Sequence, residues 1–328
     1  MTERYYCGID FGGTKIQAAV VDGDYDVLGQ ARRPTPTKGG PADVAEAMAE
    51  ALREAAEQAG VDPAALSGVG VGSPGAIDSK AGVVTSARNL PGWEGAFALG
   101  PALESALGAP TAIGNDVDVA TGAEFHLGAA RAYQSILGVF WGTGVGGGVI
   151  LDGRPWSGRG AAGEIGHVVV KVGGARCPCG RRGCMEAYAG RGAMEERARK
   201  EHDAGAKTQL FKIMEERGRP RLTSGVWARA LRHNDHLAVQ LIDRAVEALG
   251  AGVASCLNVL DVEAVIIGGG LGIRLGQPYV ERIADAIQPH LFADDRPPAI
   301  HLAALGDLGG AIGGALLVES TVEATARA

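Results

Sequence analysis

Short apolar segments alternate with amphipathic helical patterns along most of the chain. The apolar segment Tyr5–Ile9 is followed by two glycines and then by apolar residues at Ile16, Ala18 and Val20. This second segment has the two-residue period of a strand, so the start of the chain is predicted to form a strand–turn–strand hairpin. A similar pattern in Val139–Ile150 predicts a second hairpin.

Helical periods fill most of the remaining chain. Residues 42–59 place Val44, Met48 and Leu52 on one face, and Gly60 follows as a C-terminal cap. The charged segment Met194–Arg221 is expected to be surface helix and loop. The βα alternation predicts an α/β fold with parallel strands covered by helices. Other predicted strands are Gly68–Val71, Thr111–Ile113 and Ala264–Ile267, and other predicted helices are Pro101–Leu107, Val117–Leu127, Ser224–Arg232, His236–Leu260 and helices continuing to Glu319.

The two hairpin turns have the composition of phosphate-binding loops. Glycine backbone lets a phosphate approach amide N–H groups, and a carboxylate such as Asp10 suits the Mg²⁺ that accompanies a nucleotide. An ordinary tight β-turn is the alternative for the first turn alone, whereas two copies favour a duplicated α/β unit with a nucleotide between its halves. A Walker loop is excluded, because its glycine spacing and final Lys-Ser/Thr are missing. The turn residues are Asp10, Gly12, Gly13, Thr14 and Lys15 in the first copy and Gly142, Thr143 and Gly144 in the second.

A third glycine cluster follows the predicted strand Ala264–Ile267. It consists of Gly268, Gly269 and Gly270. Glycines at the carboxyl end of a strand leave room for a flat ligand, at the position where open α/β sheets bind their ligands. Gly269 and Gly270 are therefore candidates for binding the adenosine of ATP.

Three of the five cysteines lie within eight residues of one another, and a histidine precedes them. His167, Cys177, Cys179 and Cys184 suit a closed tetrahedral Zn²⁺ site with no open position for water, which predicts a structural zinc. A zinc knuckle for nucleic acid is the rival interpretation, and the acidic chain disfavours it. The carboxylates of Glu164 and Glu186 remain free to contact a polyhydroxylated ligand.

Length and charge narrow the class of protein. A chain of 328 residues fits two domains better than one. Its net charge of −7 argues against a broad nucleic-acid or membrane surface. No secretory signal or apolar run of spanning length is found, so a cytoplasmic protein is expected, in which cysteines serve as metal ligands and not as disulfides. Cys7 and Cys256 lie in apolar patterns and are expected to be buried.

These motifs together resemble the ROK family of bacterial sugar kinases and repressors, and most closely its ATP-dependent glucokinase branch. The loop Gly72–Asp78 and the pair Asn115–Asp116 also match that family, and the resemblance runs from about Tyr5 to about Leu317. It implies duplicated ribonuclease H-like domains of the actin/hexokinase type with a cleft between them. The expected small domain is residues 1–115, with helix 310–328 packing back on it, and the large domain is residues 116–309.

The resemblance implies phosphorylation of glucose at its C6 hydroxyl. Asp116, at the end of an apolar strand, would accept the hydroxyl proton, although its position also suits a helix N-cap. Asn115 would bind an adjacent hydroxyl. The remaining expected sugar contacts are Glu164, His167 and Glu186, with the backbone of Gly75 and Ala76 and the side chain of Asn89 as weaker candidates.

Several alternatives stay open at this stage. Another hexose or N-acetylhexosamine would need only one or two changed residues in the sugar site, and some relatives use polyphosphate as donor. The family's repressors carry an extra N-terminal winged-helix region, whereas this chain starts directly at its first hairpin strand. Family members are commonly dimers or tetramers, so a homo-oligomer is expected. Gly114 and Gly190 depart from the family pattern, which usually has an acidic residue and a serine at these places.

Overall fold

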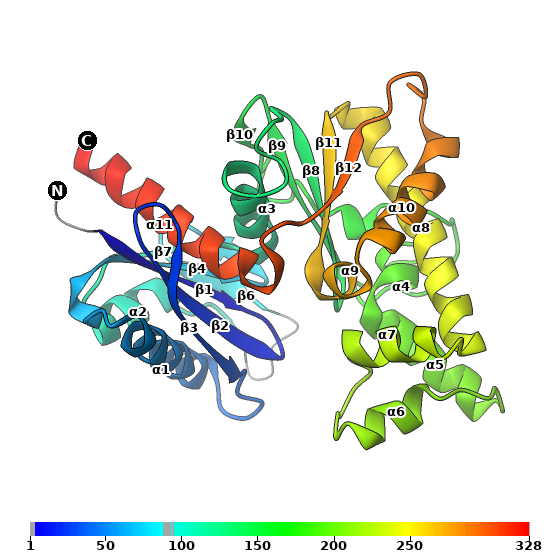
Figure 1. The fold of residues 1–328 in the computed structure, drawn as a ribbon, viewed down its shortest axis with the longest axis horizontal. Coiled ribbons are helices and arrows are strands. Elements are labelled where there is room, and N and C mark those ends of the chain that lie inside the picture. Colours follow the sequence, from blue (N-terminus) through cyan, green and yellow to red (C-terminus); the bar gives the residue numbers. More distant parts are fainter. Residues whose placement is uncertain (1–3, 88–92, 94, 328) are drawn as a thin grey trace. The chain divides into compact units, whose positions relative to one another are not determined.

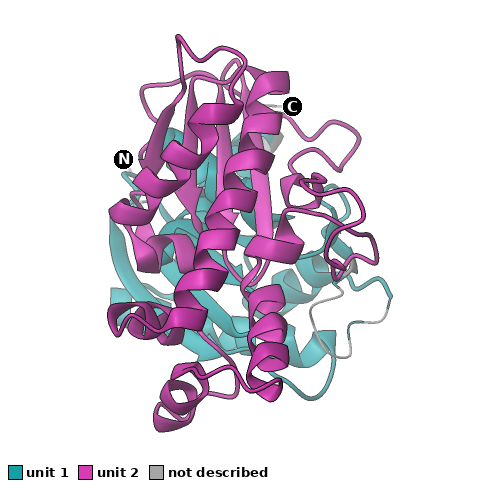
Figure 2. Ribbon diagram, turned by 90° about the vertical axis from the view of Figure 1, so that its right-hand side faces the viewer, with its two compact units in different colours: residues 1–128, 307–328 teal, residues 129–306 magenta. Residues whose placement is uncertain are grey.

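The computed structural model describes residues 4–87, 93 and 95–327. The chain divides into two compact units, which are coloured separately in Figure 2. Unit 1 consists of residues 1–128 and 307–328, and unit 2 consists of residues 129–306. No helix within the described ranges is long and apolar enough to cross a membrane.

Unit 1 is built on a five-stranded mixed sheet with the order β3-β2-β1-β4-β7. β1, β2 and β3 are antiparallel neighbours, whereas β4 and β7 continue the sheet in parallel with β1. The predicted first hairpin is thus the antiparallel half of this sheet. The strands are β1 (Tyr5–Phe11), β2 (Lys15–Val21), β3 (Val27–Pro34), β4 (Leu66–Ser73) and β7 (Thr111–Asn115), and a separate small sheet pairs β5 (Ala76–Asp78) with β6 (Val83–Ser86).

Helices cover both faces of this sheet, as Figure 1 shows. On one face lie α1 (Pro41–Ala59) and α2 (Leu99–Leu107), and on the other lie α11 (Gly309–Arg327) and α3 (Asp116–His126). Side chains alternate along each strand between the two faces of the sheet, so apolar residues pack against the helices on both faces. Ile9 belongs to the apolar cluster beneath α1, whereas Tyr6 packs with residues of α11. The short 3₁₀ helix Pro63–Ala65 also belongs to the unit, and a second one, Gly306–Leu308, lies where the chain returns to it.

The helix α11 approaches the sheet so closely that side chains are excluded from the contact. A Cβ atom on Gly8 of β1 would stand 1.6 Å from the carbonyl oxygen of Ala311. The helix begins Gly-Gly-Ala-Ile-Gly-Gly-Ala, which gives it the small surface that such contact needs. The last segment of the sequence is therefore part of the core of unit 1.

Unit 2 repeats the same sheet plan. Its sheet has the order β10-β9-β8-β11-β12, in which β8, β9 and β10 are antiparallel neighbours and β11 and β12 run parallel with β8. The predicted duplication of an α/β unit is confirmed by this repeated order. The strands are β8 (Ile136–Trp141), β9 (Val145–Leu151), β10 (Arg154–Pro155), β11 (Ala264–Gly268) and β12 (Ala299–Leu302).

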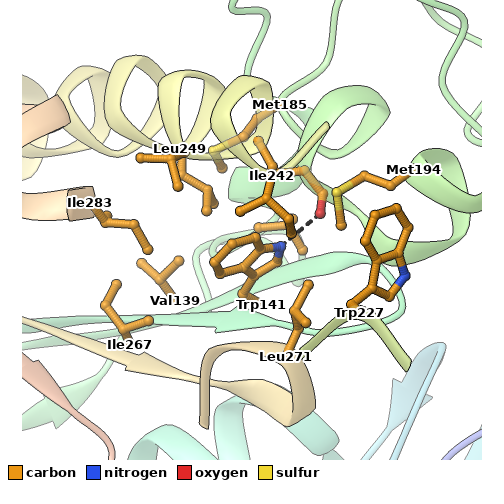
Figure 3. Packing of buried hydrophobic residues seen from close by; sticks show 14 of the residues in the cluster. Val139, Trp141, Met185, Met194, Trp227, Ile242, Leu249, Ile267, Leu271 and Ile283 are labelled. Atoms are coloured by element: carbon orange, nitrogen blue, oxygen red, sulfur yellow. Dashed lines mark hydrogen bonds between the residues drawn. The ribbon is translucent and has the colours of Figure 1, made fainter. Parts of the chain in front are cut away.

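The long helix α8 supplies much of the core of unit 2. It packs on α10 and α4, and its apolar stripe faces the sheet. Figure 3 shows Trp141, the last residue of β8, among the side chains of Ile242, Leu249 and Ile283. The indole N–H of Trp141 donates a hydrogen bond of 2.7 Å to the carbonyl oxygen of Ala189. The helices are α4 (Glu186–Ala189), α5 (Arg191–Asp203), α6 (Leu210–Glu216), α7 (Ser224–Arg232), α8 (His236–Leu260), α9 (Gly269–Leu275) and α10 (Gln277–Ile287), with 3₁₀ helices at Ile165–His167 and Gln288–His290.

The structure corrects several predicted elements. β3 lies in a segment for which no element was predicted, and β12 lies in a segment that was predicted to be helical. The charged segment 194–221 is not only surface, because Met194, Leu210 and Phe211 are buried in the core of unit 2. Cys256 is only partly buried, unlike Cys7. Periodicity missed these features because short edge strands and isolated apolar residues among charges carry little signal.

The compact units divide the chain later than residue 115, where the domain boundary was expected. α3 contacts β4, β7 and especially α11, all of which belong to unit 1. Unit 1 therefore continues to Gly128, and the chain returns to it at Asp307.

Candidate active site

The first glycine turn connects β1 to β2. Its narrow part is closed by a hydrogen bond of 3.0 Å from the Gly12 N–H to the carbonyl oxygen of Lys15. The hydroxyl of Thr35, at the end of β3, also donates to the carbonyl oxygen of Gly12 over 2.5 Å. Gly13 and Thr14 stay exposed at the tip. The turn is thus fixed at its base, while its tip can be approached by a ligand.

Asp10 lies at the carboxyl end of β1, partly buried beside this turn. The ammonium of Lys15 stands 3.8 Å from its carboxylate. Burial raises the pKa of Asp10, the Lys15 charge lowers it, and the charge of Asp307 raises it. Gly310 of α11 makes room for the carboxylate, because a Cβ there would stand 2.7 Å from its Cγ atom. The residues fit the Mg²⁺ prediction, since a carboxylate oxygen is a ligand that Mg²⁺ prefers.

Asn115, and not Asp116, is the N-cap of α3. Its side-chain oxygen accepts hydrogen bonds from the N–H groups of Val117 (3.0 Å) and Asp118 (3.3 Å). The amide nitrogen of Asn115 donates to no partner among the residues that the structure describes. Asp116 is instead the first residue of the helix, so the N-cap interpretation of Asp116 is wrong.

Asp116 is partly buried where β4 and β7 end. One of its oxygens accepts a hydrogen bond of 3.0 Å from the Val117 N–H. Burial is the largest influence on the carboxyl group, and the negative charge of Asp10 adds to it, so the pKa of Asp116 is raised to about 7. Hydrogen bonds from backbone N–H groups lower the pKa, and the charge of Asp118 raises it further. A carboxylate with a pKa near neutrality is suited to accept a proton in catalysis.

The Ser-Pro-Gly loop starts next to Asp116. A Cβ atom on Gly72, near the end of β4, would stand 3.4 Å from the Cα of Asp116. Gly75 has a φ of +98°, which an L side chain rarely adopts, and Ala76 begins β5. The backbone of both candidate sugar contacts therefore belongs to the same unit as Asp116. The other candidate of this region, Asn89, lies outside the described residues.

The second glycine turn connects β8 to β9 and lies against two other elements of unit 2. The N–H groups of Arg191 and Gly192, at the start of α5, donate to the carbonyl oxygens of Gly142 (3.1 Å) and Thr143 (2.9 Å). Gly269 has a φ of +78°, and its Cβ would stand 2.6 Å from the carbonyl oxygen of Trp141. The structure thus brings the second turn and the cluster Gly269–Gly270 together, as a shared phosphate and adenosine site would require.

The four predicted zinc ligands form one cluster. One ligand atom from each of His167, Cys177, Cys179 and Cys184 can be chosen so that all four lie within 4.8 Å of one another. The thiol of Cys177 is 3.8 Å from Nδ1 of His167, and the thiols of Cys179 and Cys184 are 3.8 Å apart. Three thiols and one imidazole nitrogen at these distances fit a tetrahedral Zn²⁺ ion.

Both candidate sugar-binding carboxylates border this cluster. One oxygen of Glu164 lies 3.7 Å from Nε2 of His167, whereas the Cys177 thiol lies beside the other ring nitrogen, Nδ1. One oxygen of Glu186 accepts a hydrogen bond of 3.0 Å from the Val145 N–H, and the other lies 3.7 Å from the Cys177 thiol. Glu186 therefore links the metal-type cluster to the strand that follows the second glycine turn.

Sequence reasoning missed polar residues that contact the second glycine turn or one another, and a glycine that leaves space beside Asp10. The polar residues are Arg191 and Ser224, and the glycine is Gly310. Their partners lie far away in sequence, so no local motif marks them. The only signal was the position of Arg191 immediately after Gly190, where the chain departs from the family pattern.

Comparisons with known proteins find similar sugar kinases. A glucokinase of Thermotoga maritima is 34% identical over 86% of this chain and 88% of its own. An N-acetyl-D-glucosamine kinase of Pectobacterium atrosepticum is 31% identical over 95% of this chain and 98% of its own. The crystal structure of a ROK family glucokinase from Streptomyces griseus, in complex with glucose and AMPPNP, aligns with a TM-score of 0.83 at 30% identity, over 96% of this chain and 99% of that one.

These relatives are sugar kinases, and their similarity extends over nearly the whole chain. The ROK family model itself matches residues 6–321, which includes both glycine turns, Asp116 and the Cys/His cluster. The chain belongs to the ROK family.

Proposed function

We propose that this protein transfers the γ-phosphoryl group of ATP to the C6 hydroxyl of glucose, with Asp116 as the general base. The observation that carries the proposal is the Asp116 carboxyl group, which stands at the end of β7 with a pKa raised to about 7. A base with this pKa is substantially ionised at neutral pH and still has affinity for a proton. The Thermotoga and Streptomyces relatives, both glucokinases, support glucose as the acceptor.

Each residue has a defined part in the proposed reaction. The sugar hydroxyl oxygen forms a bond to the γ-phosphorus, its proton passes to Asp116, and the bond to the β-phosphate oxygen breaks to release ADP. The Asn115 amide would donate to a neighbouring hydroxyl. Glu164, His167 and Glu186, with the backbone of Gly75 and Ala76, would orient the remaining hydroxyls, which raises the fraction of productive encounters.

The cofactors have assigned positions in this proposal. Asp10 would hold the Mg²⁺ that accompanies ATP and neutralises charge on its phosphates. The two glycine turns would bind the phosphates, and Gly269–Gly270 would lie against adenosine. A Zn²⁺ ion held by His167 and the three cysteines would fix the imidazole ring, leaving its Nε2 edge for Glu164 and the sugar.

A second candidate acceptor is an N-acetylhexosamine. The Pectobacterium relative acts on N-acetyl-D-glucosamine and is nearly as similar as the glucokinases. The mechanism at Asp116 would be the same for either sugar. The choice between the two sugars would depend on whether the residues beside C2 accommodate a hydroxyl or an N-acetyl group.

The experiment measures ADP release from Mg-ATP with glucose, mannose, fructose, N-acetylglucosamine and N-acetylmannosamine, for the native protein and for Asp116→Asn. We expect turnover to be fastest with glucose and to fall by about 10²- to 10⁴-fold in the variant, the range for loss of a general base. Faster turnover with an N-acetylhexosamine would identify that sugar as the preferred acceptor and would leave the mechanism at Asp116 unchanged. Sugar binding without turnover of any sugar would overturn the proposal and favour a non-catalytic sugar sensor.

A further inference from the structure

The guanidinium of Arg191 is held by hydroxyl groups and by no carboxylate among the described residues. One nitrogen donates to the Thr143 hydroxyl over 2.7 Å, and another lies 3.4 Å from the Ser224 hydroxyl. A guanidinium has five N–H donors, so these contacts leave donors unused. Because the residue is partly buried, its charge has lost hydration without gaining an opposite charge.

The charges that act most on Arg191 are the guanidinium of Arg221 and the carboxylate of Glu195, while the carboxylate of Glu186 borders the other side of the glycine turn at Gly144. The carboxylate of Glu195 is engaged by Arg199 (2.7 Å) and by Arg221 (3.5 Å). Arg199 and Arg221 thus share this one buried carboxylate, and Arg191 forms no ion pair with it. Burial and the nearby charge of Arg221 lower the pKa of Arg191, while Glu195 raises it. The Arg191 guanidinium is therefore left without an ion-pair partner among the described residues.

This charge is fixed at the second glycine turn by the backbone as well. The N–H groups of Arg191 and Gly192 donate to the carbonyl oxygens of the turn, so the backbone from which the side chain extends is fixed against the turn. A Cβ on Gly142 would stand 3.9 Å from the Gly270 nitrogen, which places the glycine cluster on the same turn. An anion at the turn would meet a charged fork of donors held in a set position.

We propose that Arg191 binds the phosphate chain of the donor at the second glycine turn. The inference rests on the proposed function for the identity of the donor as ATP. Thr143 and Ser224 orient the guanidinium, and its unused N–H groups donate to phosphate oxygens. Arg221 does not reach the turn in this way, because its guanidinium is paired with Glu195, and it contributes only long-range attraction.

The test measures, in the absence of sugar, the binding of a series of ligands that differ in the number of their phosphates. This series is called the ladder below. Dissociation constants for adenosine, AMP, ADP, AMPPNP and inorganic tripolyphosphate are measured by calorimetry for the native protein, Arg191→Gln and Arg191→Lys. For ligands that reach Arg191, we expect Arg191→Gln to weaken binding by about 10- to 100-fold, as for loss of a charge-assisted hydrogen bond. Adenosine binding should stay unchanged, and Arg191→Lys should restore part of the loss. The ligand with the fewest phosphates whose binding is weakened in Arg191→Gln identifies the phosphate that Arg191 contacts.

The matched control is Arg199→Gln, which removes the same charge from the same helix without touching the turn. It should leave the whole ladder unchanged. Equal weakening of adenosine and AMPPNP in Arg191→Gln would show that Arg191 only braces the turn, and an unchanged ladder would show that it binds no phosphate. Failure of the native protein to bind any phosphate ligand also overturns the inference. The native protein could instead bind tripolyphosphate tightly and no nucleotide, with the tripolyphosphate binding weakened in Arg191→Gln. This result would support the phosphate contact and identify the donor as polyphosphate in place of ATP. Sugar turnover is assayed separately, so a failure of the proposed function is recognised independently.

Discussion

Gly70 of β4 lies directly against Gly314 of α11: a Cβ atom on Gly70 would stand 1.7 Å from the carbonyl oxygen of Gly314. Backbone cannot yield as a flexible side chain does, so Gly70→Ala should push α11 away from the sheet. We expect a loss of about 1–3 kcal/mol in the free energy of unfolding, the usual cost of overpacking. Urea denaturation followed by circular dichroism measures it.

The control for this substitution is Gly122→Ala. Gly122 lies within α3, and no heavy atom outside its own helix is within 4 Å of the added Cβ. Because alanine favours a helix over glycine by up to about 1 kcal/mol, this variant should be neutral or more stable. Equal stability of Gly70→Ala and the native protein would contradict the packing described for α11.

The raised pKa of Asp116 predicts how activity depends on pH. Below a pH of about 7 the carboxyl group is protonated and cannot accept the proton of the sugar, so kcat/KM should rise with pH and level off above that value. Asp118→Asn removes one of the charges that raise the pKa, and the rise should move to lower pH. A profile flat between pH 5 and 8, with chemistry shown to limit the rate, would rule out Asp116 as the base.

The same group predicts a pH-dependent stability. The pKa of Asp116 in the folded protein exceeds its unfolded value of about 4, so the folded state favours the protonated form. This stabilisation is complete below pH 4 and is lost as the pH rises through about 7. Asp116→Asn stays neutral at every pH, so it should be more stable than the native protein at pH 8 and close to it at pH 4. Thermal unfolding at both pH values checks this, with Asp203→Asn, an exposed side chain that does not act on Asp116, as the control.

A bound zinc ion should be removable without loss of the rest of the fold. Elemental analysis should find one zinc per chain in the native protein and little in Cys179→Ser, because the remaining ligands cannot close a tetrahedral site. Cys256→Ser changes a cysteine outside the cluster and should keep its zinc. Full zinc content in Cys179→Ser would exclude the proposed ligand set.

The carboxylates beside the Cys/His cluster should control sugar affinity. Glu186→Gln keeps an oxygen for the Val145 N–H but loses the charge, and Glu164→Gln loses charge at a largely exposed position. We expect each to raise KM for the sugar by about 10-fold, as for one charged hydrogen bond, with KM for ATP unchanged. Glu196→Gln, on the exposed side of α5, serves as the control. A change confined to KM for ATP would assign these residues to the donor.

Residues with a local pattern could be predicted from the sequence. The two hairpins, the long helix α8 and the zinc-type spacing depend on neighbours a few positions away, and the structure places each where its pattern indicated. The approach of Gly310 to Asp10 and the contact of Arg191 with Thr143 join segments that are 300 and 48 residues apart. Such contacts depend on how whole elements pack, and a single sequence has no period that encodes them.

The N-cap of α3 shows a further limit to what the sequence can predict. Asn115 and Asp116 are both good capping residues, and sequence preferences do not separate them. The end of β7 decides the matter, because it leaves Asn115 extended with its oxygen over the first turn, while Asp116 is already helical. A shift of one residue thus decides whether the amide of Asn115 or the carboxylate of Asp116 caps the helix.

The return of the chain to unit 1 at Asp307 has a consequence for its synthesis. Unit 2 is one continuous stretch, so all of its strands and helices are available once residue 306 has left the ribosome. Unit 1 is begun first but lacks α11, so the faces of β1 and β4 that α11 covers stay exposed until residues 309–327 have been synthesised. The order of emergence therefore favours completion of the second half of the protein before the first, and the nascent first half is the part that would need protection by a chaperone.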